Sequence, residues 1–557
     1  MPDRGVPPSP PTWFEILIRA SEHLIGFPWN ARWRTPWSPA AAIRSHHHHQ
    51  QEVDRFGGNS QYGDPRITAD SRTDTRTEVL TTSDGGEGGD KFLHDMPHRS
   101  HVTLQNFFVF NPTLGRGEDE EDKKLLFYYP PETDSDDQLR DIGIAQGLVS
   151  FTKVFSPHKP CEVLHTQKTR QLFLEAEPDY WIVLTLNLPS QQRTRDSQTV
   201  VEYLAEDVQD PVYQAVLHKL YILFRTFNAK LADVMSSHGV DGLRKTLGEH
   251  FMTVLPQLKL QHCDILDIFL GVHFLPLDKS AFLQVHSFVG SLEKTFPEVK
   301  YTAFLCNDQL VWSGLAQRDM QLLYHYLLSN ILQGVFEAEL LAPTLSPFKG
   351  PPGAFPQARF LHGKTEDPDF IEQVPHMFMG DERYKLLIYR ALSATVCLLI
   401  EPNDLTTSLA RGLEEFLAPE LTSLANDISK QYTKLTATVN KGSQDIVCKY
   451  IYFNRMNIAQ KSSIHAERKL GFNVPSSLLR LIMDLHSDLN LMTIEGDGPN
   501  DGEMVAKTSE DWWLVAKSWD SREFYVVLNH KNANLIQISE EVKRLCNSQL
   551  QNIFFVD

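Results

Sequence analysis

A short aromatic-rich segment that runs into asparagine occurs three times along the chain, at widely separated positions. The copies are NFFVFNP at 106–112, YTAFLCND at 301–308 and KYIYFNRMN at 449–457. Runs of this length that are rich in aromatic residues and end in turn residues are typical of β-strands. A second apolar segment follows each copy: PDYWIVLTLNL from Pro178, ERYKLLIYRAL from Glu382 and EDWWLVAKSW from Glu510. We therefore expect three related, strand-rich units.

The spacing between the copies indicates separate domains, because a solenoid needs a fixed period that these positions lack. A chain of 557 residues is also too long for one ordinary hydrophobic core. Three domains of roughly a hundred or more residues each would divide it naturally. We expect these domains at 102–255, 256–432 and 433–557.

The first unit shows the order of its elements most clearly. NFFVFNP is followed by a strand KLLFYYP, a helical stretch DDQLRDIGIAQGLVSFTKVF, a segment EVLHTQKTRQLFLEA that we interpret as one strand, and the strand DYWIVLTLNL. A helix with Val216, Leu220, Leu223, Phe224 and Phe227 at helical spacing closes the unit. Antiparallel strands flanked by helices predict an α+β fold with mixed, mostly antiparallel sheets, and not a βαβ nucleotide-binding fold.

The third unit repeats this plan and ends in the stretch LIQISEEVKRLCNSQLQNIFF. Its apolar residues Ile538, Val542, Leu545 and Cys546 recur at helical spacing, so we expect a final helix that packs one face on the sheet.

The segment before the first unit has a different composition. Residues 1–101 are rich in Pro, Ser, Gly, Asp and Arg and lack the apolar periodicity of a packed core, so we expect a disordered extension. The HHHH tract at 46–49 could bind a metal ion, but an isolated tract of this kind is more often compositional. We predict no metal site.

Charge and hydropathy exclude several classes of protein. The net charge of -18 argues against nonspecific nucleic-acid binding by the whole chain. The most apolar stretch, 386–400, contains Arg390 and is shorter than the roughly 20 residues of a bilayer-spanning helix. Charged residues also interrupt the apolar patch at 13–29, where a signal peptide would be continuous. Six scattered cysteines indicate free thiols in a reducing compartment. We expect a cytosolic protein whose membrane contact is peripheral.

Motifs for covalent chemistry are absent from the sequence. It has no phosphate loop, HExxH, GxSxG or kinase signature, and the acidic run 118–122 is interpreted as a solvated loop. Cys306 could be a nucleophile beside Asn307 and Asp308, but no neighbouring His or cation would activate its thiol. We favour a hairpin that turns at Asn307 and Asp308, and we expect no enzymatic activity of the chain itself.

Several long segments resemble one known family. They include NFFVFNPTLG, FSPHKPCEVLHTQKTRQLFLEAEPDYWIVL, KYTAFLCNDQLVWSGL and EFYVVLNHKNANLIQISEEVKRLCNSQLQNIFFVD, and the similarity runs from about 105 to 557. The chain resembles the Ccz subunits of Mon–Ccz complexes, which are related to Inturned and to the Hermansky–Pudlak exchange-factor subunit. This resemblance implies three longin domains after the extension.

The resemblance also implies a function and partners. The chain would pair with a Mon subunit to form a guanine nucleotide exchange factor for the late-endosomal Rab GTPase, which promotes endosome maturation and fusion with lysosomes. It would act in the cytoplasm, peripherally on late-endosomal and lysosomal membranes, where lipid contacts are possible, and would need no cofactor. The alternative is a structural adaptor of a longin trafficking or ciliogenesis complex without exchange activity, because fold alone does not decide function.

Longin pairs are expected to join side by side through the first helix and the third strand, here 137–155 and 162–170. The helix has only a partial apolar stripe. Along the strand, His165, Gln167 and Thr169 would share one polar face, which is typical of an edge strand at an interface. The alternative is a helix packed only on its own sheet and a solvated strand. The candidate residues for the partner or GTPase interface are Leu139, Ile142, Gln146, Ser150, His165, Gln167 and Lys168.

Overall fold

The computed structural model describes residues 99–115, 118–156, 161–195, 198–341, 358–380, 382–439, 448–465, 473–495, 501–550 and 553. Of the expected extension only residues 99–101 belong to this part. The histidine tract at 46–49 and the apolar patch at 13–29 lie outside the described residues.

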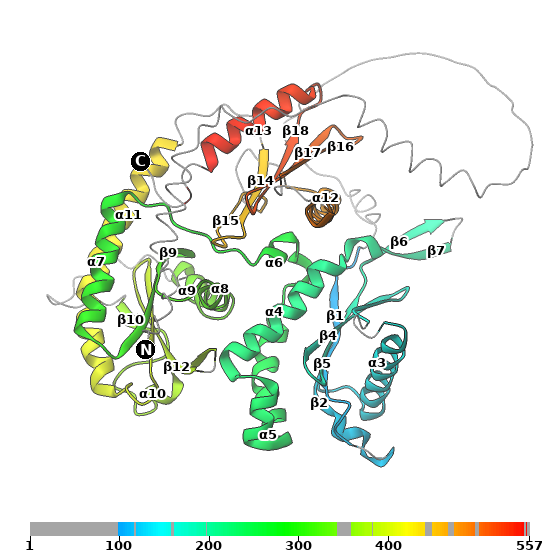
Figure 1. The fold of residues 1–557 in the computed structure, drawn as a ribbon, viewed down its shortest axis with the longest axis horizontal. Coiled ribbons are helices and arrows are strands. Elements are labelled where there is room, and N and C mark those ends of the chain that lie inside the picture. The colour runs from blue at the N-terminus through cyan, green and yellow to red at the C-terminus, as the bar shows by residue number, and fades with distance from the viewer. Residues whose placement is uncertain are drawn as a thin grey trace, which may run out of the picture. The chain divides into compact units, whose positions relative to one another are not determined.

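The first unit is built on a five-stranded sheet with the order β2-β1-β5-β4-β3 (Figure 1). Its strands are β1 (Thr103–Phe110), β2 (Leu125–Tyr129), β3 (Val163–His165), β4 (Thr169–Glu177) and β5 (Tyr180–Asn187). A separate two-stranded ribbon, β6 (Ser190–Arg195) and β7 (Gln198–Tyr203), follows β5. The acidic run lies between β1 and β2 and forms a 3-10 helix, η1 (Glu118–Lys124), where the sequence suggested a loop.

The second and third units repeat this strand order, which is β9-β8-β13-β12-β10 in the second and β15-β14-β18-β17-β16 in the third. The second-unit strands are β8 (Val299–Cys306), β9 (Gln309–Ser313), β10 (Ala358–Phe360), β11 (His376–Met379), β12 (Glu382–Ala391) and β13 (Ala394–Ile400). Those of the third unit are β14 (Cys448–Asn454), β15 (Gln460–Ser462), β16 (Gly502–Lys507), β17 (Trp512–Trp519) and β18 (Arg522–Asn529). Every ladder between these strands is antiparallel. The α+β prediction is therefore confirmed.

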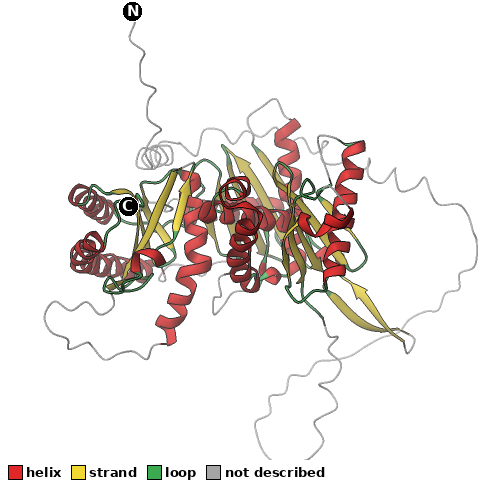
Figure 2. Ribbon diagram, turned by 90° about the horizontal axis from the view of Figure 1, so that it is seen from below, coloured by secondary structure: helices red, strands yellow, loops and turns green. Residues whose placement is uncertain are grey.

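Helices lie on both faces of the sheets (Figure 2). The first unit has α3 (Ser135–Phe155), α4 (Asp210–Asn228) and α5 (Leu231–Val254), and a connector carries the short helix α6 (Ile265–Phe269). The second unit has α7 (Lys279–Thr295), α8 (Gln317–Tyr326), α9 (Gln333–Leu341), α10 (Phe370–Gln373) and α11 (Thr407–Val439). The third has α12 (Ser476–Glu495) and α13 (Leu535–Gln549). Within the described ranges, no helix combines the length and the apolar character that a membrane span requires.

The period-2 alternation of β1 explains why the first sheet is covered on both sides. Phe108 packs in a cluster with α3, whereas the ring of the adjacent Phe107 lies 4.8 Å from that of Phe251 in α5. Both side chains are fully buried. Figure 1 shows the matching arrangement, with α3 on one side of this sheet and α5 on the other.

The hairpin expected around Cys306 is present, since β8 pairs with β9 in antiparallel register. Asn307 adopts a left-handed conformation with φ 52, which an asparagine tolerates better than most residues do. The Cys306 thiol lies 3.7 Å from the Ser393 hydroxyl, and burial raises the pKa of this thiol. The thiol is therefore poorly suited to act as a nucleophile.

The second repeated segment needs a correction. In units two and three it forms β12 and β17, the fourth strands of their sheets, whereas PDYWIVLTLNL in the first unit forms β5, which is a third strand. The true equivalents of β5 are β13 and β18. The sequence alone aligned β5 with β12 and β17, one strand too early in units two and three. The error arose because adjacent buried strands have similar apolar composition.

The segment EVLHTQKTRQLFLEA is also not one strand. It folds into the hairpin β3–β4, in which His165 pairs with Arg170 across a turn. The expectation that Gln167 shares a face with His165 and Thr169 along one strand is therefore wrong, because Gln167 lies in the turn between β3 and β4. Thr166 stabilises the turn, since its hydroxyl accepts the backbone N–H of Thr169 at 2.9 Å.

Candidate partner-binding surface

Helix α3 is fixed to its sheet by a small polar network at its N-terminal half. Its Asp141 carboxylate accepts hydrogen bonds from the Asn106 amide in β1 and from the Tyr128 hydroxyl in β2, each at 2.8 Å. Burial, together with the Asp141 carboxylate, raises the pKa of Tyr128, so its hydroxyl stays a donor. Asp134 caps the helix by accepting the N–H of Asp136. These contacts set which face of α3 points inward.

The inner face of α3 belongs to the core of the first unit. Ile142, Ala145 and Val149 are buried and pack with aromatic side chains of the sheet. Ile142 is only 3% exposed. This residue was a candidate for the partner interface, but the structure assigns its side chain to the protein's own core.

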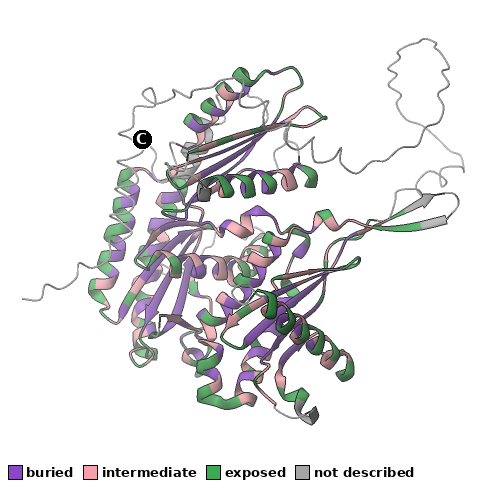
Figure 3. Ribbon diagram, turned by 45° about the vertical axis from the view of Figure 1, so that its right-hand side comes forward, coloured by how far each residue is buried: buried purple, intermediate pink, exposed green. Residues whose placement is uncertain are grey.

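The outer face of α3 is apolar as well. Ile144, Phe151, Val154 and Phe155 are 49%, 63%, 75% and 74% exposed, and we call them the outer stripe of α3. The rings of Phe151 and Phe155 lie 5.0 Å apart, as expected for a pair four residues apart on a helix. Figure 3 shows buried strands, and helices whose surfaces carry exposed residues on one side.

Sequence reasoning missed the outer stripe of α3. The helix has apolar residues on two faces, so the apolar periodicity of its sequence is weak. The spacing of Phe151 and Phe155 at positions i and i+4 could have indicated the second apolar face. A soluble helix rarely exposes two adjacent phenylalanines unless another surface covers them.

The remaining helix candidates occupy the margins of α3. Leu139 and Gln146 are partly buried, and the Lys124 ammonium donates a hydrogen bond of 3.4 Å to the Gln146 side-chain oxygen. Ser150 is exposed, next to the outer stripe of α3. Ser150 is therefore the one helix candidate that the structure leaves open to a partner.

The edge strand β3 ends in an ionic cluster. The His165 imidazole lies 2.7 Å from one oxygen of Asp210, the first residue of α4. The other oxygen of Asp210 lies 3.2 Å from the Arg170 guanidinium, which is buried. His165 was expected to face a partner, but its ring links β3 to α4 while remaining partly exposed.

Gln167 and Lys168 lie at the tip of the β3–β4 turn and are exposed. The structure thus brings the seven candidates into one unit but divides them between α3 and the β3–β4 hairpin. The edge itself is only three residues long. A short edge strand offers few backbone groups, so a partner would need the adjacent helix for most of its contact area.

The helices that correspond to α3 in the other two units, α8 and α12, are in contact with other parts of the chain. In the second unit the ring of Tyr326, at the end of α8, stacks on Phe227 of α4 at 3.8 Å. In the third unit α12 contacts the 3-10 helix η2 (Ala205–Asp207) of the first unit through an ion pair of 2.8 Å between Arg480 and Glu206. The outer stripe of α3 stays exposed among the described residues, and α12 also exposes apolar side chains, with Leu491 and Met492 56% and 57% exposed.

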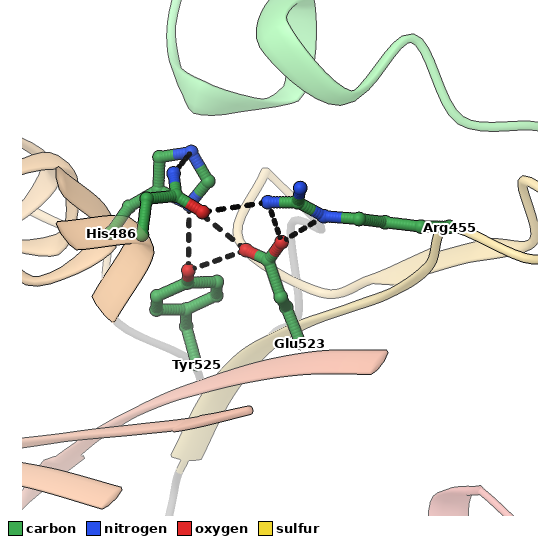
Figure 4. Close-up of polar contacts among 5 residues, drawn as sticks. Arg455, His486, Glu523 and Tyr525 are labelled. Atoms are coloured by element: carbon green, nitrogen blue, oxygen red, sulfur yellow. Dashed lines mark hydrogen bonds and ion pairs between the residues drawn. The ribbon is translucent and has the colours of Figure 1, made fainter. Parts of the chain in front are cut away.

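The third unit holds a compact ionic cluster around Glu523 (Figure 4). The buried carboxylate accepts hydrogen bonds from Arg455 at 2.7 Å and Tyr525 at 2.7 Å, and the His486 ring lies at 2.9 Å. Burial alone would raise the pKa of Glu523, but His486, Tyr525 and Arg455 together lower it to about 2. Each group is held by the others, as in a structural cluster that orders a core.

Three family models match the chain in order. One described as the first longin domain of INTU, CCZ1 and HPS4 matches residues 104–229. Models described as Intu longin-like domain 2 and Intu longin-like domain 3 match residues 299–423 and 445–545. Each match contains one of the three repeated sheets, so the chain is built from three longin-like domains.

Whole proteins with the same organisation are similar to this chain. A "Vacuolar fusion protein CCZ1 homolog" of Nematostella vectensis is 40% identical over 461 residues, which cover 82% of this chain and 98% of that protein. A protein of that name from Xenopus laevis is 38% identical over 467 residues, with the same shares covered. One from Dictyostelium discoideum is 27% identical over 457 residues, or 81% of this chain and 98% of that protein. By this similarity the chain belongs to the CCZ1 family of vacuolar fusion proteins.

Proposed function

We propose that the chain is one subunit of a heterodimeric guanine nucleotide exchange factor for the late-endosomal Rab GTPase, and that its partner is a Mon subunit with a longin domain of its own. The complex would act peripherally on late-endosomal and lysosomal membranes and promote fusion. Membership of the vacuolar fusion family supports the trafficking role. The exchange activity rests on the resemblance to Mon–Ccz complexes.

The outer stripe of α3 is the observation that carries the pairing step. It combines exposed aromatic rings with the short edge strand β3 in the first unit. Aromatic residues are enriched in protein interfaces, and burying them supplies most of the binding energy. The partner would therefore lie over α3, with the β3–β4 turn and its Gln167 and Lys168 at the rim.

Exchange itself requires no covalent chemistry. A protein that binds the nucleotide-free GTPase more tightly than the loaded form lowers nucleotide affinity by thermodynamic linkage. The task needs a shaped surface for the GTPase switch regions, which we propose the first longin domains of both subunits share.

Nucleotide-release kinetics test the proposal. Release of a fluorescent GDP analogue from the Rab GTPase is followed with this chain alone, with the Mon subunit alone and with both. We expect little acceleration by either subunit and strong acceleration by the pair. A stable pair that leaves the release rate unchanged would favour the adaptor function, and full activity of the single chain would contradict the shared platform.

A double variant, Phe151→Asp with Phe155→Asp, tests the surface. Both side chains are exposed, so each change should alter the free energy of unfolding by roughly 0.5 kcal/mol or less. Carboxylates would remain unpaired in an apolar interface, so affinity for the Mon subunit should fall by about tenfold or more. Leu283→Asp is the matched control, because Leu283 is a 57% exposed apolar residue on α7 in the second unit. Equal binding by both variants would place the interface elsewhere.

A further inference from the structure

The connector between the first and second units contacts the third unit, which is far away in sequence. Phe269, the last residue of α6, is 5% exposed. Its ring stacks on Phe453 of β14 at 4.7 Å and meets His486 of α12 edge-on at 5.3 Å. The connector thus inserts an aromatic side chain beside the Glu523 cluster.

After α6 the connector runs extended between the second and third units. On one side Val272 donates its N–H to Ile458 and accepts the N–H of Gln460, both at 2.8 Å. On the other side Leu310 of β9 donates its N–H to His273 at 2.8 Å and accepts the N–H of Leu275 at 3.0 Å. The backbone groups of Val272 therefore bond to the third unit, and those of His273 and Leu275 bond to the second. This is the geometry of an extended strand, in which neighbouring residues face opposite sides.

Gly271 allows the close approach of these backbones. A Cβ atom at this position would lie 2.3 Å from the Cβ of Gln460, which is far inside contact distance. The N–H of Gly271 donates to the Gln460 side-chain oxygen at 3.2 Å. A glycine is needed because the third unit occupies the space that any other side chain would fill.

A histidine–carboxylate contact lies on the outer side of this junction. One oxygen of Asp264 caps α6 by accepting the N–H of Leu266 at 2.8 Å, and the other lies 2.5 Å from the His465 imidazole. Asp264 is 8% exposed, so its second oxygen depends on this ring for a partner.

The charged groups around His465 come from three elements. Asp264 and Asp267 of the connector carry negative charge, and Lys449 of β14 carries positive charge. Lys219 of α4 lies 3.8 Å from Asp267 and offsets part of its charge. The hydrogen bond to Asp264 raises the pKa of His465, while burial opposes this shift.

We propose that residues 264–275 form a strap that holds the third unit against the second, and that the His465–Asp264 contact is a proton-dependent lock on this strap. The geometry carries the proposal, because one segment makes main-chain hydrogen bonds to both units and inserts Phe269 into the third. Opening of the strap would free the edge of β9 and the turn before β15 together.

A substitution that introduces a steric clash at Gly271 of the full-length chain tests the strap. In Gly271→Ala, hydrogen exchange at 265–275 and 458–465 should accelerate by about tenfold or more, while β1 and β5 keep their protection. Gly290→Ala in α7 is the control, because a Cβ at that site meets nothing within 4 Å. Unchanged exchange in Gly271→Ala would overturn the proposal.

A second variant tests the lock and does not depend on how the chain tolerates a steric clash. His465 has a folded pKa above its unfolded value of about 6.5, so its contribution is complete below that pH and is lost as pH rises through the folded pKa. Protection of the strap in the wild type, corrected for intrinsic exchange, should therefore be highest below about pH 6.5 and fall as the pH is raised further. His465→Gln should show the low protection at every pH, and His530→Gln should behave as the wild type. Equal pH dependence in His465→Gln and the wild type would refute the lock.

Discussion

Single residues of α3 differ in role although they lie close in sequence. Ile142 is 3% exposed and packs on the first sheet, whereas Ile144 is 49% exposed and belongs to the outer stripe of α3. The two side chains are chemically identical, so their different roles depend only on their positions in the structure.

Truncating each isoleucine should separate stability from binding. Ile142→Ala leaves a cavity in the core and should lower the free energy of unfolding of the first unit by about 2–4 kcal/mol. Ile144→Ala should change it by roughly 0.5 kcal/mol or less but weaken binding to the Mon subunit. Hydrogen exchange of β1 and β5 reports the first quantity and a binding titration the second. A larger stability loss in Ile144→Ala would mean that the two faces of α3 are reversed.

Glu523 gives the third unit a specific acid sensitivity. Its folded pKa of about 2 lies below the ordinary value, so its stabilisation is present above the unfolded pKa and is lost as pH falls toward 2. Glu523→Gln leaves Arg455 and His486 without the carboxylate and should destabilise the third unit at pH 7 by about 3 kcal/mol.

Exchange of the β17 and β18 amides at pH 7 and at pH 3.5 measures this effect. The variant should lose less protection on acidification than the wild type does. Glu541→Gln is the control, since its carboxylate pairs with Arg544 on the surface of α13 and a surface ion pair contributes about 1 kcal/mol or less. Equal acid sensitivity in wild type and Glu523→Gln would contradict the assigned role.

Among the elements, the β3–β4 hairpin links the first sheet to α4. His165 and Arg170 both approach Asp210, whereas Lys168 lies exposed at the turn. His165 and Lys168 look equally accessible in the sequence. In the structure, His165 stabilises the contact with α4, whereas Lys168 lies at the surface of the turn.

Charge reversal at the two positions should have unequal effects. His165→Asp places a second carboxylate beside Asp210 and should destabilise the hairpin by about 1 kcal/mol, because like charges at contact distance repel. Lys168→Asp should leave the hairpin near wild-type stability and lower affinity for the Mon subunit only modestly, as expected at an interface rim. Local exchange of the β3 and β4 amides distinguishes the two, and identical behaviour of both variants would count against the Asp210 cluster.

At the scale of the whole molecule, the strands of the described sheets all lie from residue 103 onward. The residues just before β1 also have partners in the first unit. Arg99 forms an ion pair with Asp207, and the N–H of Ser100 donates to the Ser190 carbonyl at 2.9 Å. A truncation that keeps these two residues should preserve both of these contacts.

Deletion of residues 1–95 should therefore leave the folding and partner binding of the chain intact. That segment has too little apolar periodicity in its sequence to dock as a packed element. The melting temperature and co-purification with the Mon subunit measure the outcome. Loss of the heterodimer in the truncated chain would show that the segment takes part in assembly.

Local sequence patterns were sufficient for the number of units and for part of the secondary structure, but not for the β3–β4 hairpin or for η1. Alternation, turn residues and helical spacing predicted the β8–β9 hairpin and the inward face of α13, where Ile538, Val542 and Cys546 are buried and Leu545 is partly buried. These features depend on neighbours within a few residues, so the local pattern contains them. The resemblance to a known family supplied the longin fold and the candidate surface.

The tertiary structure decided which faces are covered and by what. It showed that β5 corresponds to β13 and β18, that Ile142 faces inward, and that Phe151 and Phe155 face outward. It also placed Phe269 of the connector in the third unit. Such facts depend on contacts between residues that are far apart in sequence, and a helix with apolar residues on two faces does not specify which one meets its own sheet.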